Sequence, residues 1–111
     1  MLPMPTSSHA RRLDRRTNVD LFVNKYVDGY PHLCSALDIS WSGIRLETAF
    51  GPEVHREFYP IELGLPDSDR AIWVWTRPVW TAKRQQALRF VGMDAPDSRA
   101  LARYLARRLE A

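Results

Sequence analysis

Much of the chain places apolar residues at every second position, a period that is typical of β-strands. Near the start, Val19, Leu21 and Val23 follow this pattern. Because successive side chains of a strand point to opposite faces of a sheet, the pattern predicts a strand with one buried face. Short segments of similar texture follow, and they predict further strands within residues 33–39, 44–48, 54–65, 71–82 and 87–93.

Turns and prolines divide these segments. The run Asp28-Gly29-Tyr30-Pro31 predicts a turn after the first strand. Pro60 and Pro78 lie inside two predicted strands, and proline cannot donate a hydrogen bond to a neighbouring strand. We therefore expect Pro60 to place its strand at a sheet edge or in a bulge, and Pro78 to kink or interrupt its strand.

After Pro96 the period changes to that of an amphipathic helix. Pro96 suits the first helical position, Asp97 favours the positive N-terminal end of the helix dipole, and either Asp94 or Ala95 can cap the helix. The predicted helix spans residues 96–110, with a leucine stripe opposite an arginine stripe, formed by Leu101, Leu105 and Leu109 and by Arg99, Arg103 and Arg107. Five to seven antiparallel strands with one C-terminal helix predict a mainly β fold, either a small barrel or a sandwich.

Length and composition fit one globular domain. The chain has 111 residues, of which 45% are hydrophobic and 26% are charged. Cys34 is the single cysteine, so no internal disulfide forms. Residues 1–10 are rich in proline and serine and predict a flexible tail. They lack the apolar region of a signal peptide, and no run is long enough to span a membrane. We expect a cytoplasmic protein without membrane insertion.

The charge of the chain is concentrated in a short arm, residues 11–18. The arm contains Arg11, Arg12, Arg15 and Arg16 with one acid, Asp14, whereas the rest of the chain contains as many acids as cations. The whole net charge of +3 therefore belongs to the arm. Guanidinium groups hold phosphate oxygens in pairs and also bind the Hoogsteen edge of guanine. The arm predicts the binding of one anionic ligand at one place.

Candidate catalytic and metal-binding residues are few. The three histidines, His9, His32 and His55, lack the spacing of metal ligands. Cys34 lies in an apolar strand, which favours a buried structural thiol over a nucleophile. The sequence also lacks a phosphate-binding glycine loop and a dinucleotide fingerprint. We expect no enzyme activity, no catalytic residue, no metal site and no cofactor.

A second polar motif, Asp38-x-Ser40-x-x-Gly43, lies between the predicted strands 33–39 and 44–48. On an extended segment Asp38 and Ser40 point to the same side, where a carboxylate and a hydroxyl can bind the polar edge of a ring. Gly43 permits a tight bend or a close backbone approach. The same residues also fit an ordinary Asx or Ser turn between two strands.

Taken together, these residues resemble a PilZ domain. That family combines an Arg-x-x-x-Arg arm with a later Asp/Asn-x-Ser-x-x-Gly motif, and residues 11–109 follow this order. The arm fits in two registers, and the Val-x-Leu-x-Val segment that begins at Val19 favours the register of Arg12 and Arg16. Residues 88–105 also resemble the last strand and helix of the family. Ala87 is a departure, because the family often has glycine there.

The resemblance implies a six-stranded antiparallel PilZ-type β-barrel that binds cyclic di-GMP. The domain would comprise residues 11–111, with the barrel at 19–93. Arg12 and Arg16 would hold phosphates and a guanine, Asp38 and Ser40 would hydrogen-bond guanine, and Gly43 would let the turn close beneath it. These implied site residues are, in full, Arg11, Arg12, Arg15, Arg16, Asp38, Ser40 and Gly43.

The resemblance also bears on ligand number and on partners. Arg11 occupies the position that influences whether one ligand or a stacked pair binds, while Arg15 is expected to matter less. Trp41 either stacks on a base or packs inside the barrel. Closure of the arm onto the barrel would signal to a downstream protein partner. Nucleic-acid polymers are not the expected ligand.

Two alternative functions remain open at this stage. A small barrel can bind single-stranded nucleic acid on aromatic platforms, here Trp73, Trp75 and Trp80, although alternating tryptophans are more often core residues. A PilZ-like module without ligand could also act through protein contacts on the arginine stripe. That stripe has a simpler interpretation as the solvated face of the helix.

Overall fold

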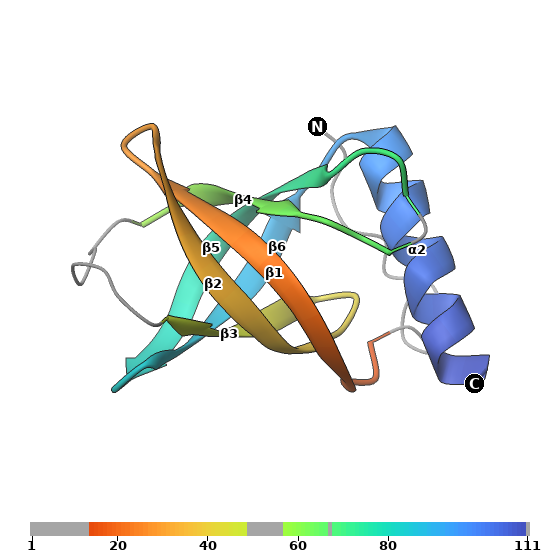
Figure 1. Ribbon diagram of the computed structural model, residues 1–111, viewed down its shortest axis with the longest axis horizontal. Helices are drawn as coiled ribbons and strands as arrows, with labels where there is room; N and C mark the ends of the chain where they lie inside the picture. Colours follow the sequence, from red (N-terminus) through yellow and green to blue (C-terminus); the bar gives the residue numbers. More distant parts are fainter. Residues whose placement is uncertain (1–13, 49–56, 67, 111) are drawn as a thin grey trace.

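The computed structural model describes residues 14–48, 57–66 and 68–110, which form a closed six-stranded antiparallel barrel and one helix (Figure 1). The strands follow one another around the barrel in the order β1-β2-β3-β6-β5-β4. The predicted mainly β, six-stranded antiparallel barrel with a C-terminal helix is therefore confirmed. Its elements are β1 (Thr17–Val27), β2 (Tyr30–Ile39), β3 (Gly43–Thr48), β4 (Tyr59–Leu63), β5 (Ile72–Ala82), β6 (Gln85–Gly92) and α2 (Ala95–Glu110).

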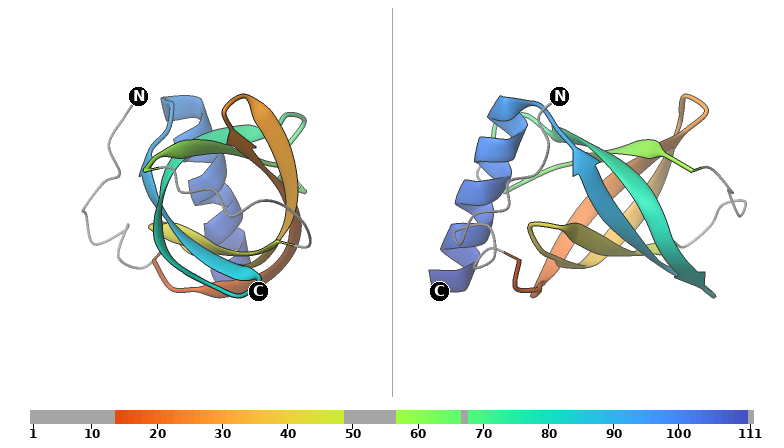
Figure 2. Two further views of the ribbon diagram at one scale, coloured as in Figure 1. Left: turned by 90° about the vertical axis from the view of Figure 1, so that its left-hand side faces the viewer. Right: turned by 180° about the vertical axis from the view of Figure 1, so that it is seen from behind.

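The helix α2 covers one end of the barrel, as the end-on view in Figure 2 shows. Leu101 and Leu105 are fully buried, whereas the arginine stripe on the opposite face is exposed. The amide of Ser98 donates to the carbonyl of Asp94 over 2.9 Å, which makes Asp94 the cap. Pro96 is consequently the second helical residue rather than the first. None of the described helical residues forms a helix that is long and apolar enough to cross a membrane.

The first hairpin follows its turn signal closely. Asp28 and Gly29 join β1 to β2, and both have a positive φ, 53° and 84°. Two such residues match the twist of the flanking strands in a two-residue hairpin. The strand β1 begins at Thr17, so the last two residues of the predicted arm belong to the barrel.

Proline positions differ in part from expectation. The strand that contains Pro60 is β4, and it pairs with both β1 and β5, so the expected edge position is wrong. The β1–β4 pairing covers residues 61–63 of β4 and stops before Pro60, which explains why a missing amide is tolerated there. The strand β5 continues unbroken through Pro78, so the interruption considered there is wrong, but its register with β6 shifts between Pro78 and Trp80.

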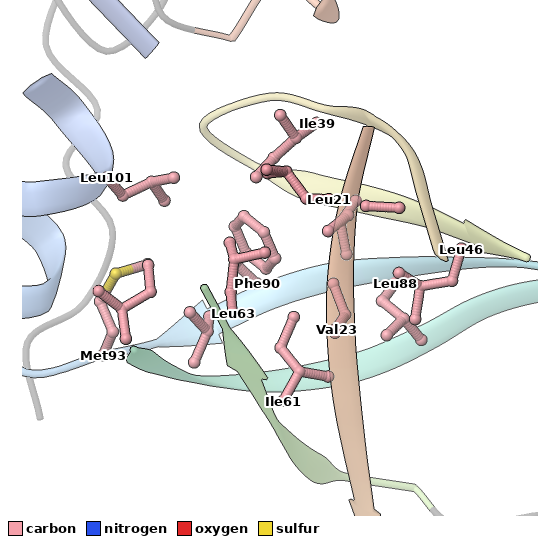
Figure 3. Packing of buried hydrophobic residues seen from close by; sticks show 14 of the residues in the cluster. Leu21, Val23, Ile39, Leu46, Ile61, Leu63, Leu88, Phe90, Met93 and Leu101 are labelled. Atoms are coloured by element: carbon pink, nitrogen blue, oxygen red, sulfur yellow. The ribbon is translucent and has the colours of Figure 1, made fainter. Parts of the chain in front are cut away.

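The core fills the barrel from the inward positions of each strand. Leu21 and Val23 point inward from β1 while Phe22 is exposed, as their alternation predicts. Figure 3 shows how they pack with inward residues of the other strands and with Met93 and Leu101 at the helical end. Cys34 also belongs to this core, and burial raises the pKa of its thiol. The predicted structural cysteine is therefore confirmed.

The tryptophans of β5 do not join this core. Trp73, Trp75 and Trp80 remain exposed at 43%, 42% and 44%, on the outer surface of the barrel. Ile72 and Val74 take the inward positions instead and are fully buried. The prediction that the tryptophans lie in the core is therefore wrong. Alternation separates the two faces of a strand, but it cannot show which face is buried when both carry apolar residues.

Lys25 points into the barrel and lacks an ionic partner among the described residues. It is 7% exposed, and its Nζ donates to Gln86 Oε1 over 3.2 Å, an oxygen that also accepts from the Tyr59 hydroxyl over 2.7 Å. The same Nζ lies 5.4 Å from the centroid of the Tyr59 ring. Burial lowers the pKa of the Lys25 ammonium, because the charged form loses its hydration.

We predict that Lys25→Met raises the free energy of unfolding at neutral pH by about 1 kcal/mol or more, because no charge is then buried. Because the pKa of Lys25 is lower in the folded than in the unfolded state, the charged lysine destabilises the fold at low pH. This destabilisation disappears as the pH rises toward 10.5. The advantage of the variant should therefore shrink with rising pH. Urea denaturation between about pH 7 and 10.5 measures it, with the exposed Lys83→Met as control. An advantage that grows with pH would contradict this assignment.

Candidate functional site

The turn between β2 and β3 holds the second sequence motif and is fixed by backbone hydrogen bonds. The amide of Ser40 donates to the carbonyl of Gly43 over 2.8 Å and closes the turn. The amide of Phe90 donates to the carbonyl of Ser42, also over 2.8 Å, and ties the turn to β6. Both ends of the motif therefore have a fixed backbone position on the barrel.

Gly43 is required here by a close backbone approach. A Cβ atom at this position would lie 2.4 Å from the carbonyl oxygen of Leu88 in β6. No flexible side chain can move aside, because the obstacle is main chain. Of the two roles expected for this glycine, the close approach is the one that the structure confirms.

Asp38 is buried, 6% exposed, and lies between two arginines. Arg16 Nη1 donates to Asp38 Oδ1 over 2.6 Å, and Arg45 Nε lies 2.9 Å from Oδ2. The Arg45 N–H is not aligned for a hydrogen bond, so this second contact is an ion pair alone. One carboxylate thus connects a residue of the arm with a residue of β3.

Ser40 is also buried, and its hydroxyl serves the turn itself. Ser40 Oγ accepts from the amide of Ser42 over 3.3 Å and lies 3.3 Å from Ser42 Oγ. This is the ordinary serine turn that the sequence left open. The Ser40 hydroxyl is therefore already engaged within the turn, and a ligand that binds it would compete with these contacts to Ser42.

The described part of the arm lies against this turn. Asp14 Oδ1 accepts a hydrogen bond from the amide of Ser42 over 3.0 Å, and Arg16 reaches Asp38 as given above. Arg15 is exposed and forms no ion pair or hydrogen bond with another described residue. Arg11 and Arg12 lie outside the described residues. Of the two arm arginines that the structure describes, Arg16 lies in the site and Arg15 does not.

Trp41 lies within the same motif, but its ring belongs to the core. It is 5% exposed and packs in the main hydrophobic cluster, with no partner for its Nε1 among the described residues. Of the two roles considered from the sequence, packing inside the barrel is the one that this conformation shows.

Arg45 and Asp14 are the site residues that sequence reasoning missed. Arg45 pairs directly with Asp38 across the β2–β3 hairpin. Counting outward from the turn would have revealed two opposite charges at facing positions, which is a recognised cross-strand pair. The sequence offers no comparable signal for Asp14, because its contact depends on how the arm folds back.

The assembled site offers charge and hydrogen bonds rather than a reactive group. Two guanidinium groups, one buried carboxylate and a hydroxyl can bind phosphates and a polar ring edge. Within the described ranges, no group of three or more histidines, cysteines or acids is arranged to hold a metal ion.

Comparison with sequence families identifies the relationship. The model of the family described as "PilZ domain" matches residues 10–107. The chain belongs to the PilZ domain family. The matched range includes the arm from Arg11 onward and the β2–β3 turn. PilZ domains are binding and adaptor modules. No curated protein matches the chain.

Solved structures share the fold of this PilZ domain. The Bacillus subtilis inhibitor of motility, MotI/DgrA, superposes with a TM-score of 0.73 at 24% identity, over 86% of this chain and 49% of its own. The present chain thus spans about half the length of MotI. The PilZ domain of CeSA from a cellulose-synthesizing bacterium gives 0.65 at 12% identity, covering 87% and 99%. An uncharacterized Legionella protein gives 0.60 at 12% identity, covering 86% and 95%.

We predict that Gly43→Ala lowers the free energy of unfolding by about 1–3 kcal/mol, because the new methyl group forces β3 away from β6. Gly64→Ala is the matched control, since a Cβ atom there meets nothing within 4 Å. Urea denaturation of both variants compares them. Equal stability of the two variants would show that the β3–β6 approach does not require glycine.

Proposed function

We propose that this PilZ domain is a cyclic di-GMP receptor or adaptor that binds the dinucleotide between its arm and the β2–β3 turn. The observation that carries the proposal is the contact of Arg16 with Asp38, 2.6 Å long, which joins the two halves of the family motif. The ligand carries two phosphates and two guanines, and the residues of this site suit both.

Ligand binding would have to change the ion pair between Arg16 and Asp38. Arg16 is occupied by Asp38, so it has to leave this carboxylate in order to reach a phosphate or a guanine edge. Asp38 then keeps Arg45 as its remaining cation and can accept hydrogen bonds from guanine. Arg12 adds a second guanidinium to the ligand. The arm changes position relative to the barrel, and a downstream protein senses that change.

The surroundings of the tryptophans disfavour the nucleic-acid alternative. Trp73 and Trp75 line a hollow whose described lining residues include Asp28 and no lysine or arginine. Trp80 lies near Lys83 and Arg84, but one ring does not form a platform for successive bases. The arginine stripe of α2 is solvated, as its simpler interpretation predicts.

Calorimetric titration of the purified chain with cyclic di-GMP tests the proposal directly. We expect saturable binding with an affinity in the micromolar range, roughly −8 kcal/mol, and much weaker binding of the linear dinucleotide and of GMP. The stoichiometry distinguishes one ligand from a stacked pair, for which Arg11 is the determining position. A folded protein that shows no heat at roughly tens of micromolar would refute the proposal.

We predict that Arg12→Ala and Arg16→Ala each weaken cyclic di-GMP binding at least about tenfold, or ~1.4 kcal/mol, because each removes a charge-assisted contact. Arg99→Ala on the exposed face of α2 removes the same charge and is the control. Calorimetry at constant salt compares the three variants. If Arg99→Ala weakens binding as much as the arm variants, net charge rather than the site determines affinity.

We further predict that Arg45→Gln weakens binding about fivefold, or ~1 kcal/mol, although Arg45 need not touch the ligand. Without Arg45, the Asp38 carboxylate has Arg16 as its only cation among the described residues, so releasing Arg16 costs more. In an Asp38→Asn background no carboxylate holds Arg16 at this position. Adding Arg45→Gln to that background should therefore cause no further loss of binding affinity. A loss that persists in the Asp38→Asn background would instead indicate direct contact between Arg45 and the ligand.

A further inference from the structure

The outer wall of the barrel carries a group of aromatic side chains that the proposed ligand site does not use. Phe58, Trp73 and Trp75 are exposed at 49%, 43% and 42%. The Tyr26 ring lies beside that of Trp73, with centroids 4.9 Å apart and planes tilted by 44°. Together these rings line an open hollow of about 420 Å³. A contiguous exposed patch of this kind is characteristic of an interaction surface.

Strand pairing explains why these side chains are contiguous. Pro60 faces Trp75 and Glu62 faces Trp73 across the β4–β5 pair, so all four project from neighbouring outer positions. β1 adds Tyr26 from the other side of β4. The strands that carry the patch are part of the closed barrel, so the rings stand on a rigid surface. Rigid aromatic rings bind at a low entropic cost.

The charged side chain among the described residues that line this aromatic hollow is a carboxylate, Asp28. Arg77, two residues beyond Trp75, is exposed on the same face of β5 and lies outside this lining. Glu62 stands beside it and accepts hydrogen bonds from Tyr26 and Asn24 over 3.4 Å and 3.1 Å. Electron-rich rings bordered by carboxylates attract cations and repel phosphates.

A second hollow, of about 650 Å³, shares Trp73 and Glu62 and extends the surface toward α2. Its lining also includes Asp94 and Asp97, against one cation, Arg70. Arg70 lies 3.1 Å from Asp97, so these two charges balance each other, and Glu62 and Asp94 remain as the carboxylates of this hollow. The surface therefore continues from an aromatic part to an acidic part on either side of Trp73.

We propose that this aromatic and acidic surface binds a segment of a protein partner that presents arginine or lysine next to apolar residues. A cationic side chain would lie on the rings of Trp73 and Trp75, and its apolar neighbours would contact Phe58 and Pro60. A second cation would meet the carboxylates beyond Trp73. This occupant matches both the aromatic area and the sign of the charge.

Among the described residues, the surface shares none with the arm or the β2–β3 turn. The acidic surface and the basic ligand site therefore attract opposite charges, and a basic segment has no reason to compete with cyclic di-GMP. This inference stands independently of the proposed ligand, because it rests on a different set of residues.

Heteronuclear NMR of the full chain tests the inference with a capped pentapeptide, Leu-Arg-Pro-Leu-Arg, as probe. We expect the indole signals of Trp73 and Trp75 to shift saturably, and replacement of both arginines by neutral citrulline to weaken binding about fivefold. The glutamate version of the peptide should produce no shift. Trp73→Ala should weaken binding by about fivefold or more.

Trp80→Ala is the matched control, because Trp80 lies on the same strand with the same exposure but lines a different hollow. Glu62→Gln gives a second test that retains the volume of the side chain, and it should weaken binding about threefold. Three results would each overturn the inference: equal binding of the citrulline peptide, equal loss in Trp80→Ala, or shifts caused by oligothymidylate but not by the peptide.

Discussion

Closure of the barrel brings β3 against β6, and this approach is possible at the motif because Gly43 has no side chain. The carbonyl of Leu88 occupies the space that a Cβ atom would need. The same contact lets Phe90 bind the carbonyl of Ser42, so the β2–β3 turn is anchored to the barrel wall. The anchored turn determines the position of Asp38 and of the Ser42 amide, which donates a hydrogen bond to Asp14.

On this rigid turn the charges of the site are arranged around one buried carboxylate. Asp38 holds Arg16 of the arm and Arg45 of β3 at the same time. A carboxylate with two cations can release one of them without being left buried and unpaired, which would be costly. Arg16 is therefore held on the barrel by a carboxylate that also keeps a second cation, Arg45.

The barrel wall separates opposite chemistries. Arg16 and Arg45 meet at the β2–β3 turn, while aromatic rings and carboxylates lie along the outer side of β1, β4 and β5, from Asp28 to the start of α2. A closed barrel makes this separation possible because each strand contributes one row of side chains to the outside and one to the core. The inner rows supply the hydrophobic cluster, and the outer rows remain available for binding.

The sequence by itself determined the strands, the hairpin at Asp28-Gly29, the amphipathic helix and the motif around Asp38, because each depends on local periodicity or turn chemistry. It could not determine which apolar face of β5 is buried, because Ile72 and Val74 alternate with Trp73 and Trp75. It also could not show that Arg45 shares Asp38 with Arg16, nor that Pro60 lies within a closed barrel. These outcomes depend on pairings between distant segments, and only the tertiary structure, through barrel closure and the folding of the arm onto the turn, decided them.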